Sequence, residues 1–328
     1  MRRLVFLILV IWLFCPRWAL AQEKFRAASG GFSTAIHSVL WVGYEKKIFN
    51  KYGLDVEYLA LESGTIGMQT LLAKEVQALF STGALGITAN LQGADVTIVA
   101  GGINFIPNKM VVRPEIKSAE DLKGKTVAIS RFGSASDYAT QVALEKLGIN
   151  PKQVAIVQVG GNLTRFAALN SGSVHATLLN EPLATMAIRK HRMNSLIDLA
   201  ESGVPFPQNC FLVKRSYLET NRPKIVNFMK AVIEGYATLK RDKALAVQLI
   251  KKYIRVNDEE AGIAYDYYVA KHGDGVLSLP DRRGLEFIIT QIAKDNPKAI
   301  GQTPESLKLL DASVLEEIRR SGFIDKVK

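Results

Sequence analysis

Short apolar runs alternate with longer amphipathic segments along the first two thirds of the chain. In each unit a β-prone run ends in a small polar turn, and a segment with apolar positions at helical spacing follows it. Strands separated by helices of this length indicate parallel sheets built from βαβ units. The predicted strands of these units are Lys24–Ser29, Asp55–Leu59, Val76–Phe80, Val96–Ala100, Thr126–Ile129, Val154–Val159 and Val174–Leu179.

The stretch Lys125–Gly148 shows this unit most clearly. A polar turn links the strand Thr126–Ile129 to an amphipathic segment that ends at Gly148. Ser134, with Asp137 three residues later, predicts the start of a helix, and Gly148 predicts its end. The free N–H groups and the positive dipole end at such a start can bind a carboxylate, sulfonate or phosphate. The alternative is that the turn holds no ligand, because similar turns occur in every α/β protein.

Matching polar turns follow other predicted strands. Ser33-Thr34 and Ser81-Thr82-Gly83 stand at the same place in their units as Ser134-Ala135-Ser136. Ligands of α/β sheets bind outside the carboxyl ends of the strands. Two lobes that each offer such turns therefore predict a ligand cleft between them.

The order of the units indicates two α/β lobes. One lobe takes residues 22–107 and 208–328, and the other is the insert 108–207. Two chain crossings, near Ile103–Lys109 and Val204–Asn209, would form a hinge.

The remaining segments fit around this plan. Asn104–Pro114 is expected to be a connecting stretch, Ser118–Leu122 a short helix, and Leu196–Leu199 and Phe211–Val213 the last strands. The chain is mostly helical after Asn221. The predicted helices include Ala35–Lys51, Ile66–Lys74, Ala84–Gln92, Leu183–Lys190, Pro223–Lys240, Lys243–Tyr253, Asp258–Lys271, Arg283–Ala293 and Ser313–Arg320.

The N-terminus has the pattern of a secretory signal. Arg2 and Arg3 precede the apolar run Leu4–Phe14, and Ala19-Leu20-Ala21 is a small-x-small cleavage site. The run of 11 residues is shorter than the roughly 20 that span a bilayer. An uncleaved anchor is the alternative. We therefore expect an exported, periplasmic protein that is cleaved after Ala21.

Charge and cysteine content narrow the possible partners. The formal charge of the 328 residues is +11, and loss of three arginines with residues 1–21 lowers it to +8. The basic residues are spread along the chain, which argues against nucleic acid as a partner. Only Cys210 survives in the mature chain, so no internal disulfide is expected. Cys210 fits buried packing better than a nucleophilic role.

The titratable residues give few candidates for catalysis. His37, His175, His191 and His272 show no metal-ligand spacing, and no hydrolase, P-loop or dinucleotide motif occurs. We expect no metal, cofactor or catalytic residue. His37 falls about one turn into the first helix, near the expected cleft, and could contact ligand.

Glu181 and Arg131 can each be interpreted in two ways. Glu181 would suit a ligand with an amino or amidine group, or it caps a helix that begins at Pro182. Arg131 would clamp an anion, or it pairs with a neighbour such as Asp137. If both face the cleft, a zwitterion would fit.

Several stretches resemble one family of exported solute-binding proteins. Trp41–Val56 (WVGYEKKIFNKYGLDV) is similar to a stretch near the start of the nitrate/sulfonate/taurine-type receptors of ABC importers. Ser118–Ala128, Leu169–Ala176 and Glu181-Pro182 resemble later motifs of that family in the right order. These receptors share a fold with the thiamine-pyrimidine (NMT1/THI5-like) proteins. His175 stands where the family usually has Asp.

The resemblance implies a type II periplasmic-binding-protein fold, in which two lobes of mostly parallel sheets close on a ligand. It implies a small-molecule ligand, a permease partner and a monomeric receptor. The ligand-binding positions that it implies are Ser33, Thr34, His37, Ser81, Thr82, Gly83, Ala84, Arg131, Ser134, Ala135, Ser136, Asn180 and Glu181.

Two other functions stay open on the same fold. An enzyme of the pyrimidine- or menaquinone-pathway type would need a general base in the cleft, and His37 is the candidate. The fungal pyrimidine synthases are disfavoured because their cysteine-rich motif cannot occur in a chain with one mature cysteine. A sensor without transport is the other alternative.

Overall fold

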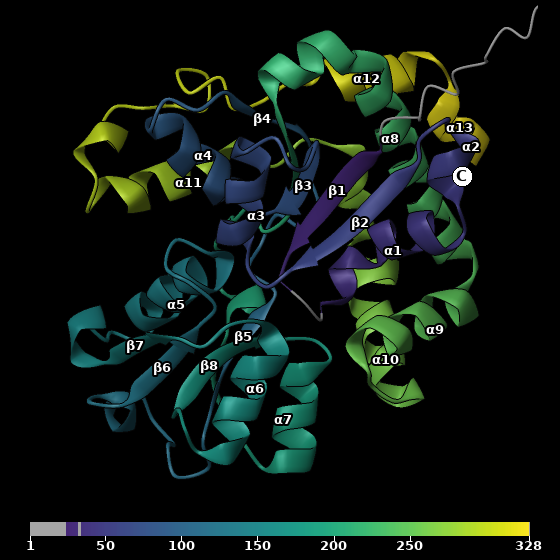
Figure 1. Cartoon of the computed structure of the whole chain (residues 1–328). Coiled ribbons are helices and arrows are strands. Elements are labelled where there is room, and N and C mark those ends of the chain that lie inside the picture. Colours follow the sequence, from purple (N-terminus) through teal and green to yellow (C-terminus); the bar gives the residue numbers. More distant parts are fainter. Residues whose placement is uncertain (1–23, 32–33, 328) are drawn as a thin grey trace, which may run out of the picture.

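The computed structural model describes residues 24–31 and 34–327 (Figure 1). The predicted signal segment 1–21 and Ser33 lie outside these residues. The described residues form two five-stranded sheets, each flanked by helices, which make up two lobes. The two-lobed α/β fold expected from the sequence is confirmed.

The sheet of the first lobe has the strand order β2-β1-β3-β10-β4. β1 pairs in parallel with both β2 and β3, and β10 is antiparallel to its neighbours β3 and β4. The strands are β1 Phe25–Gly30, β2 Val56–Leu61, β3 Ala78–Ser81, β4 Val96–Ala100 and β10 Cys210–Lys214.

The sheet of the second lobe repeats this plan with the order β7-β6-β8-β5-β9. β6 pairs in parallel with β7 and β8, and β5 is antiparallel to β8 and β9. The strands are β5 Asn108–Val112, β6 Thr126–Ile129, β7 Ala155–Gln158, β8 Ala176–Asn180 and β9 Asn194–Asp198.

The antiparallel strand of each sheet is the first strand after the chain crosses from the other lobe. This corrects the expectation for Asn104–Pro114, which contains β5 rather than only a connection. β5 enters straight from the crossing without a helix before it, so the βαβ rule that found the other strands gives no signal for it. Met110, Val111 and Val112 are fully buried between the helical layers.

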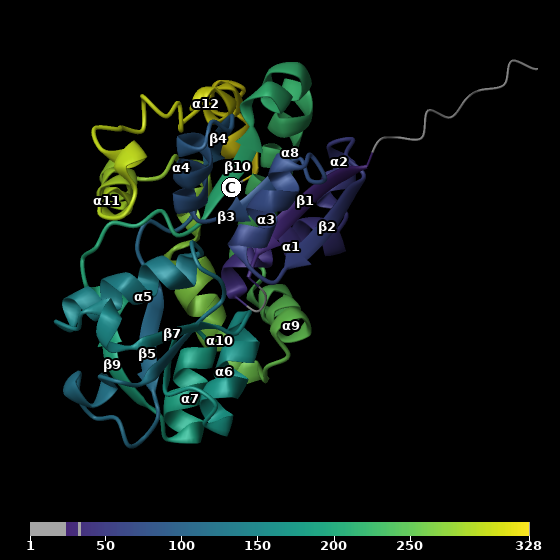
Figure 2. The ribbon, with the colours of Figure 1, turned by 60° about the vertical axis from the view of Figure 1, so that its left-hand side comes forward.

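Helices cover both faces of the first sheet (Figure 2). Two neighbouring residues of β1 face opposite cores. Ala27 packs in the core with α1 (Ser38–Glu45) and α8 (Arg215–Arg241), and Ala28 packs in the core with α3 and α4. The other helices of this lobe are α2 Ile48–Lys51, α3 Gly64–Leu72, α4 Gly83–Leu91, α9 Lys243–Ile254, α10 Asp258–Tyr265, α11 Arg282–Ala293, α12 Ser313–Arg320 and α13 Phe323–Val327.

Two long predicted helices are interrupted. The segment expected as Ala35–Lys51 is a 3₁₀ turn (Ala35–His37) followed by α1 and α2, because Lys47 adopts a left-handed conformation with φ of 53°. The segment expected as Asp258–Lys271 continues after α10 as a π-helix, Asp266–Lys271. Both interruptions follow local backbone geometry that apolar periodicity does not reveal.

In the second lobe, α5 (Ala135–Lys146) packs on one face of the sheet. α6 (Asn162–Ser171) and α7 (Leu183–His191) pack on the other. α5 begins at Ser134 as expected. None of the helices in the described part of the chain combines the length and the hydropathy that crossing a membrane requires.

Two antiparallel segments carry the chain between the lobes. Phe105 and Pro205 form a bridge there, and the Phe206 N–H donates to the Asn104 carbonyl at 3.0 Å. The Gly83 N–H at the start of α4 donates to the Pro207 carbonyl at 2.9 Å, which ties one crossing to the first lobe. The exact lobe limits at residues 107/108 and 207/208 stay predictions.

Candidate functional site

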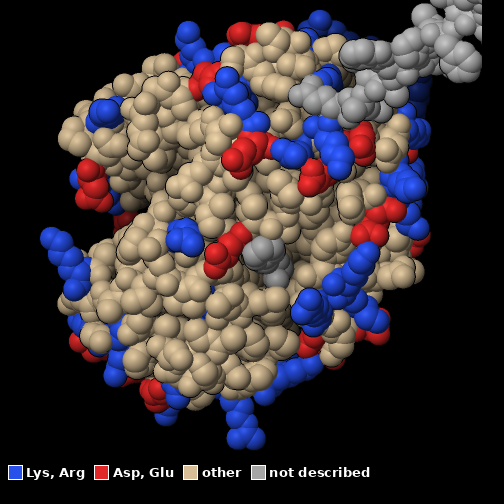
Figure 3. All heavy atoms as spheres, in the orientation of Figure 1, with Lys and Arg blue, Asp and Glu red and all other residues tan. Residues whose placement is uncertain are grey.

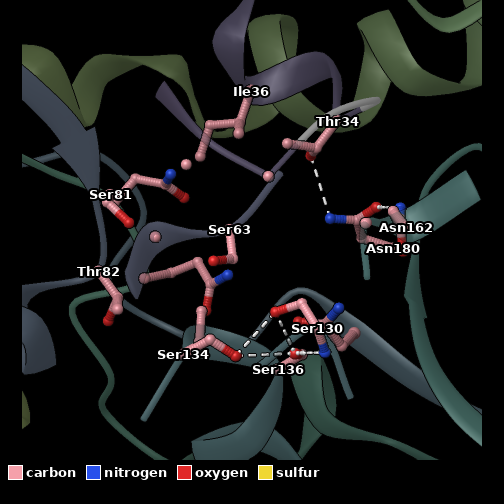
Figure 4. Close-up of a pocket in the computed structure, with 18 of the residues that line it drawn as sticks. Thr34, Ile36, Ser63, Ser81, Thr82, Ser130, Ser134, Ser136, Asn162 and Asn180 are labelled. Carbon is pink, nitrogen blue, oxygen red and sulfur yellow. Dashed lines mark hydrogen bonds between the residues drawn. The ribbon is translucent and has the colours of Figure 1, made fainter. Parts of the chain in front are cut away.

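A cavity of about 70 Å³ lies between the lobes (Figure 4). It is much smaller than the roughly 300–1,000 Å³ that drug-sized ligands occupy, so it suits a small molecule. The residues that line it are Gly30, Gly31, Thr34, Ile36, His37, Glu62, Ser63, Gly64, Ser81, Thr82, Pro107, Asn108, Ser130, Ser134, Ala135, Ser136, Gly161, Asn162, Arg165, Asn180, Gln208 and Asn209.

Four helices begin at this cavity. Ser63 caps α3 by accepting the Ile66 N–H at 3.2 Å, and Ser134 caps α5 by accepting the Asp137 N–H at 3.4 Å. Thr82 is the cap residue of α4, and α6 starts next to Gly161. The positive dipole ends of helices from both lobes therefore converge on one small space, which favours an anionic group there.

Three serines of the second lobe form a triangle of hydroxyls on the cavity wall. The Ser130 Oγ donates to the Ser134 Oγ at 2.8 Å, and the Ser136 Oγ lies 2.9 and 3.0 Å from these two oxygens. The Ser130 N–H also donates to the Ser136 Oγ at 2.8 Å. Figure 4 shows the triangle below the open centre of the site. These hydroxyls are held in place and can turn their protons towards an acceptor.

A chain of polar side chains runs from the second lobe into the first. Arg165 Nη2 donates to the Asn162 Oδ1 at 3.2 Å, and Asn162 Nδ2 donates to the Asn180 Oδ1. Asn180 Nδ2 then donates across the cavity to the Thr34 Oγ1 at 3.0 Å (Figure 4). This last bond joins the two lobes at the cavity.

Further contacts hold the lobes together outside the cavity. The Thr65 Oγ1 donates to the Phe132 carbonyl at 3.3 Å, and the hydroxyls of Thr88 and Tyr138 lie 3.3 Å apart. The lobes thus contact each other directly, both at the cavity and outside it. On the face drawn in Figure 3, acidic and basic side chains are intermingled over both lobes rather than gathered by sign.

His37 lines the cavity as a neutral, buried imidazole. Its side chain packs edge-on against the rings of Trp41 and Phe80, and its Nε2 has no hydrogen-bond partner among the described residues. Burial lowers the pKa of His37 to about 3. A histidine that resists protonation this strongly is a poor general base at neutral pH.

Close backbone packing shapes the wall of the first lobe. A Cβ at Gly30 would lie 2.4 Å from the Gly64 Cα and 2.9 Å from the Ser81 Oγ. Only glycine at position 30 lets β1 approach the start of α3 this closely. The approach brings the helix N-terminus to the cavity.

The structure brings most of the predicted site residues together. Thr34, His37, Ser81, Thr82, Ser134, Ala135, Ser136 and Asn180 line the cavity. Gly83, Ala84, Arg131 and Glu181 are not among the lining residues, and Ser33 lies outside the described residues. Whether the lining residues contact a ligand stays a prediction.

Arg131 and Glu181 have partners of their own. Arg131 Nη2 lies 3.6 Å from the Glu62 Oε2 of the other lobe, instead of pairing with Asp137. Glu181 accepts from Lys109 Nζ at 3.2 Å and from the Thr185 N–H at 3.1 Å, so it caps α7. The structure therefore favours the helix-cap interpretation of Glu181, and neither charge is among the residues that line the cavity, as the zwitterion alternative would require.

Sequence reasoning missed several lining residues, above all Ser63, Asn162 and Arg165. Ser63 and Asn162 follow the ends of β2 and β7, so the same strand-end rule that selected Ser81 could have found them. Arg165, the fourth residue of α6, has a long charged side chain rather than a small polar one, so the strand-end rule gives no signal for it. Asn108, Gln208 and Asn209 belong to the crossings between the lobes.

The fold and the site define a class of protein: a two-lobed solute-binding fold with a polar cavity between the lobes. Residues 34–244 match the model of the family described as "NMT1/THI5 like", and the chain belongs to this family.

Individual relatives show the same likeness. A binding protein of Brucella abortus is 25% identical over 225 residues, which cover 67% of this chain and 68% of that protein. A formylaminopyrimidine-binding protein of Halalkalibacterium halodurans is 22% identical over 294 residues, which cover 87% of this chain and 83% of that protein. The structure resembles the alkanesulfonate-binding protein SsuA of Xanthomonas axonopodis pv. citri bound to MOPS. The TM-score is 0.70 at 15% identity, over 85% of this chain and 94% of that one.

Proposed function

We propose that this chain is an exported, periplasmic receptor that captures a small anionic or zwitterionic organic ligand between its lobes and delivers it to an ABC permease. The observation that carries the proposal is the cavity itself, into which both lobes direct helix N-termini and hydroxyl groups. Binding relatives in the family support a role in capture, in which no bond of the ligand is made or broken. Both walls of the site come from one chain, so a monomer is sufficient for binding.

The names of the relatives point to two different ligand chemistries. An aromatic pyrimidine is normally held between flat side chains, whereas a sulfonate needs hydrogen-bond donors and positive potential. Apart from the imidazole of His37, no aromatic ring occurs among the described lining residues. The lining therefore favours the oxyanion over the pyrimidine.

A binding screen tests this function. The mature protein is mixed with acetate, methanesulfonate, inorganic phosphate, taurine and a formylaminopyrimidine, and the melting temperature is measured for each. A ligand bound only by the folded form raises that temperature. We expect at least one of the anions to do so and to make the molecule more compact in small-angle X-ray scattering. A screen in which no compound binds, or in which a compound is chemically converted, would contradict the proposal.

A further inference from the structure

Arg165 is a buried cation on the cavity wall. Its side chain projects from the first turn of α6, and the residue is 5% exposed. Nε donates to the Gly160 carbonyl at 3.1 Å, and Nη1 donates to the Thr177 Oγ1 at 3.1 Å and to the Leu178 carbonyl at 2.6 Å. Together with the bond to Asn162, these contacts fix the guanidinium in one orientation.

All four acceptors of Arg165 are neutral. A guanidinium has five N–H donors, and the four bonds leave one hydrogen on Nη2 without a protein acceptor among the described residues. Burial alone lowers the pKa of Arg165 to about 10, and no carboxylate opposes that shift. The group is charged at neutral pH and lacks a counter-ion, which is costly for a buried charge.

The other titratable groups at the cavity do not compensate this charge. Glu62 is the acidic lining residue, and it already faces Arg131 at the cavity edge. His37 is neutral. With Glu62 paired to Arg131, Arg165 is left without a carboxylate partner among the described lining residues, next to four positive helix ends.

We infer that Arg165 supplies the counter-charge for the ligand, and that the ligand is a small, non-aromatic oxyanion of the carboxylate, sulfonate or phosphate type. The inference rests on the proposed function and narrows its ligand class. The free Nη2–H and the serine triangle offer donors to such a group, and the small volume excludes bulky substituents. An anion on Arg165 would also lie beside Asn162, whose partner Asn180 bonds to the first lobe.

Matched pairs of probes test the inference on the unmodified protein. Acetate is compared with acetamide, and methanesulfonate with methanesulfonamide, by isothermal titration calorimetry, and inorganic phosphate is a fifth probe. The two compounds of each pair are similar in size and differ in charge. We expect the better anion to bind at least about tenfold more tightly than its neutral partner, as expected for a charge-assisted hydrogen bond. The three anions distinguish the three oxyanion types.

Variants then assign the preference to Arg165. Arg165→Gln should remove the preference for the anion, whereas Arg113→Gln should keep it. Arg113 is a suitable control because it lies in the same lobe, outside the cavity lining, and pairs with Glu115. Circular dichroism and thermal melting show whether Arg165→Gln folds. If it does not fold, the inference is tested by the probe pairs on the unmodified protein alone.

Two results would overturn the inference. One is a neutral probe, or the formylaminopyrimidine, that binds as tightly as the best anion. The other is a folded Arg165→Gln protein that keeps the affinity for the anion. Either result leaves the receptor function standing, whereas the absence of binding by any compound contradicts the receptor function itself.

Discussion

The two walls of the cavity are built in different ways. On the second-lobe wall, the polar groups are already bonded to one another, in the serine triangle and in the network around Arg165, and this wall carries the uncompensated charge. On the first-lobe wall, glycine contacts bring the backbone close, His37 is neutral, and its Nε2 has no described partner. We therefore propose that the second lobe recognises the anion and that the first lobe completes the site when the lobes close.

The largest effect is expected from Gly30→Ala in the first wall. Its Cβ would overlap the Gly64 backbone, which cannot move without shifting the start of α3. Forced overlap of this kind costs about 1–3 kcal/mol of unfolding free energy, and we expect the upper end. Gly262→Ala is the control, because a Cβ there meets nothing within 4 Å and the helix should gain about 0.5–1 kcal/mol. Urea unfolding measures both, and an unchanged Gly30→Ala would refute the close approach.

The double change Ser134→Ala and Ser136→Ala breaks the triangle of the second wall. Two hydrogen bonds to a charged ligand group are lost, so affinity should fall by about 10- to 100-fold. Loss of the α5 cap should lower stability by about 1 kcal/mol, and the buried Ser130 N–H, which loses its acceptor, adds a cost of about 1 kcal/mol or more, so thermal melting checks that the variant is folded. The exposed, mutually bonded pair Ser171 and Ser173 offers the same double change as a control. Calorimetry that finds equal affinity for both double variants would place the anion elsewhere.

The neutral state of His37 predicts a pH dependence of stability. The pKa is about 3 in the folded chain and about 6.5 when unfolded, so between these values only the unfolded state takes up the proton. Stability contributed by this group is therefore lost as the pH falls below about 6.5, by up to about 1.4 kcal/mol per pH unit. When urea unfolding is measured between pH 7 and 4.5, the free energy of unfolding of His37→Asn should decline less steeply with falling pH than that of the unmodified protein. Parallel declines would mean that His37 is not held neutral.

Thr34→Val tests the bond that joins the two walls. The variant keeps the shape of the side chain but removes the acceptor of Asn180 Nδ2, which should cost about 1 kcal/mol in the closed state. Ligand affinity should fall by about three- to tenfold, because closure is less favourable. Thr290→Val removes a hydroxyl from an exposed part of α11 and should leave affinity unchanged. Equal affinities of the two variants would show that the Thr34–Asn180 bond does not support closure.

The smallest effect is expected from Arg131→Gln. Arg131 and Glu62 are each about 40% exposed, and such pairs contribute about 0–1 kcal/mol. Affinity should change by less than about threefold, and added salt should reduce the difference. A loss of tenfold or more would restore the interpretation of Arg131 as an anion clamp and weaken the case for Arg165.

Most of the fold could be predicted because strand, turn and helix alternate clearly in the chain. β6, the Ser134 cap and α5 follow directly from local pattern. β5 could not be found in this way, because it pairs antiparallel with β8 and β9, and those partners lie far away in the sequence. Its assignment depends on tertiary pairing rather than on its own residues.

The site was predictable where it follows strand ends, and not where it depends on long side chains. Ser81, Thr82 and Ser134 were found because small polar residues after strands mark helix starts. Arg131 stands beside such a start but turns towards Glu62, whereas Arg165 reaches the cavity from inside a helix. The direction of a charged side chain depends on its partners in space, and the sequence does not supply those.

The central claim is that the lobes close on a ligand, and a distance between them tests it most directly. Spin labels at the exposed Lys146, near the end of α5, and Lys298, after α11, report on the opening between the lobes, and the buried Cys210 stays unlabelled. With the compound that raises the melting temperature most, we predict one short, narrow distance distribution, and a longer or broader one without it. Identical distributions with and without that compound would contradict the account.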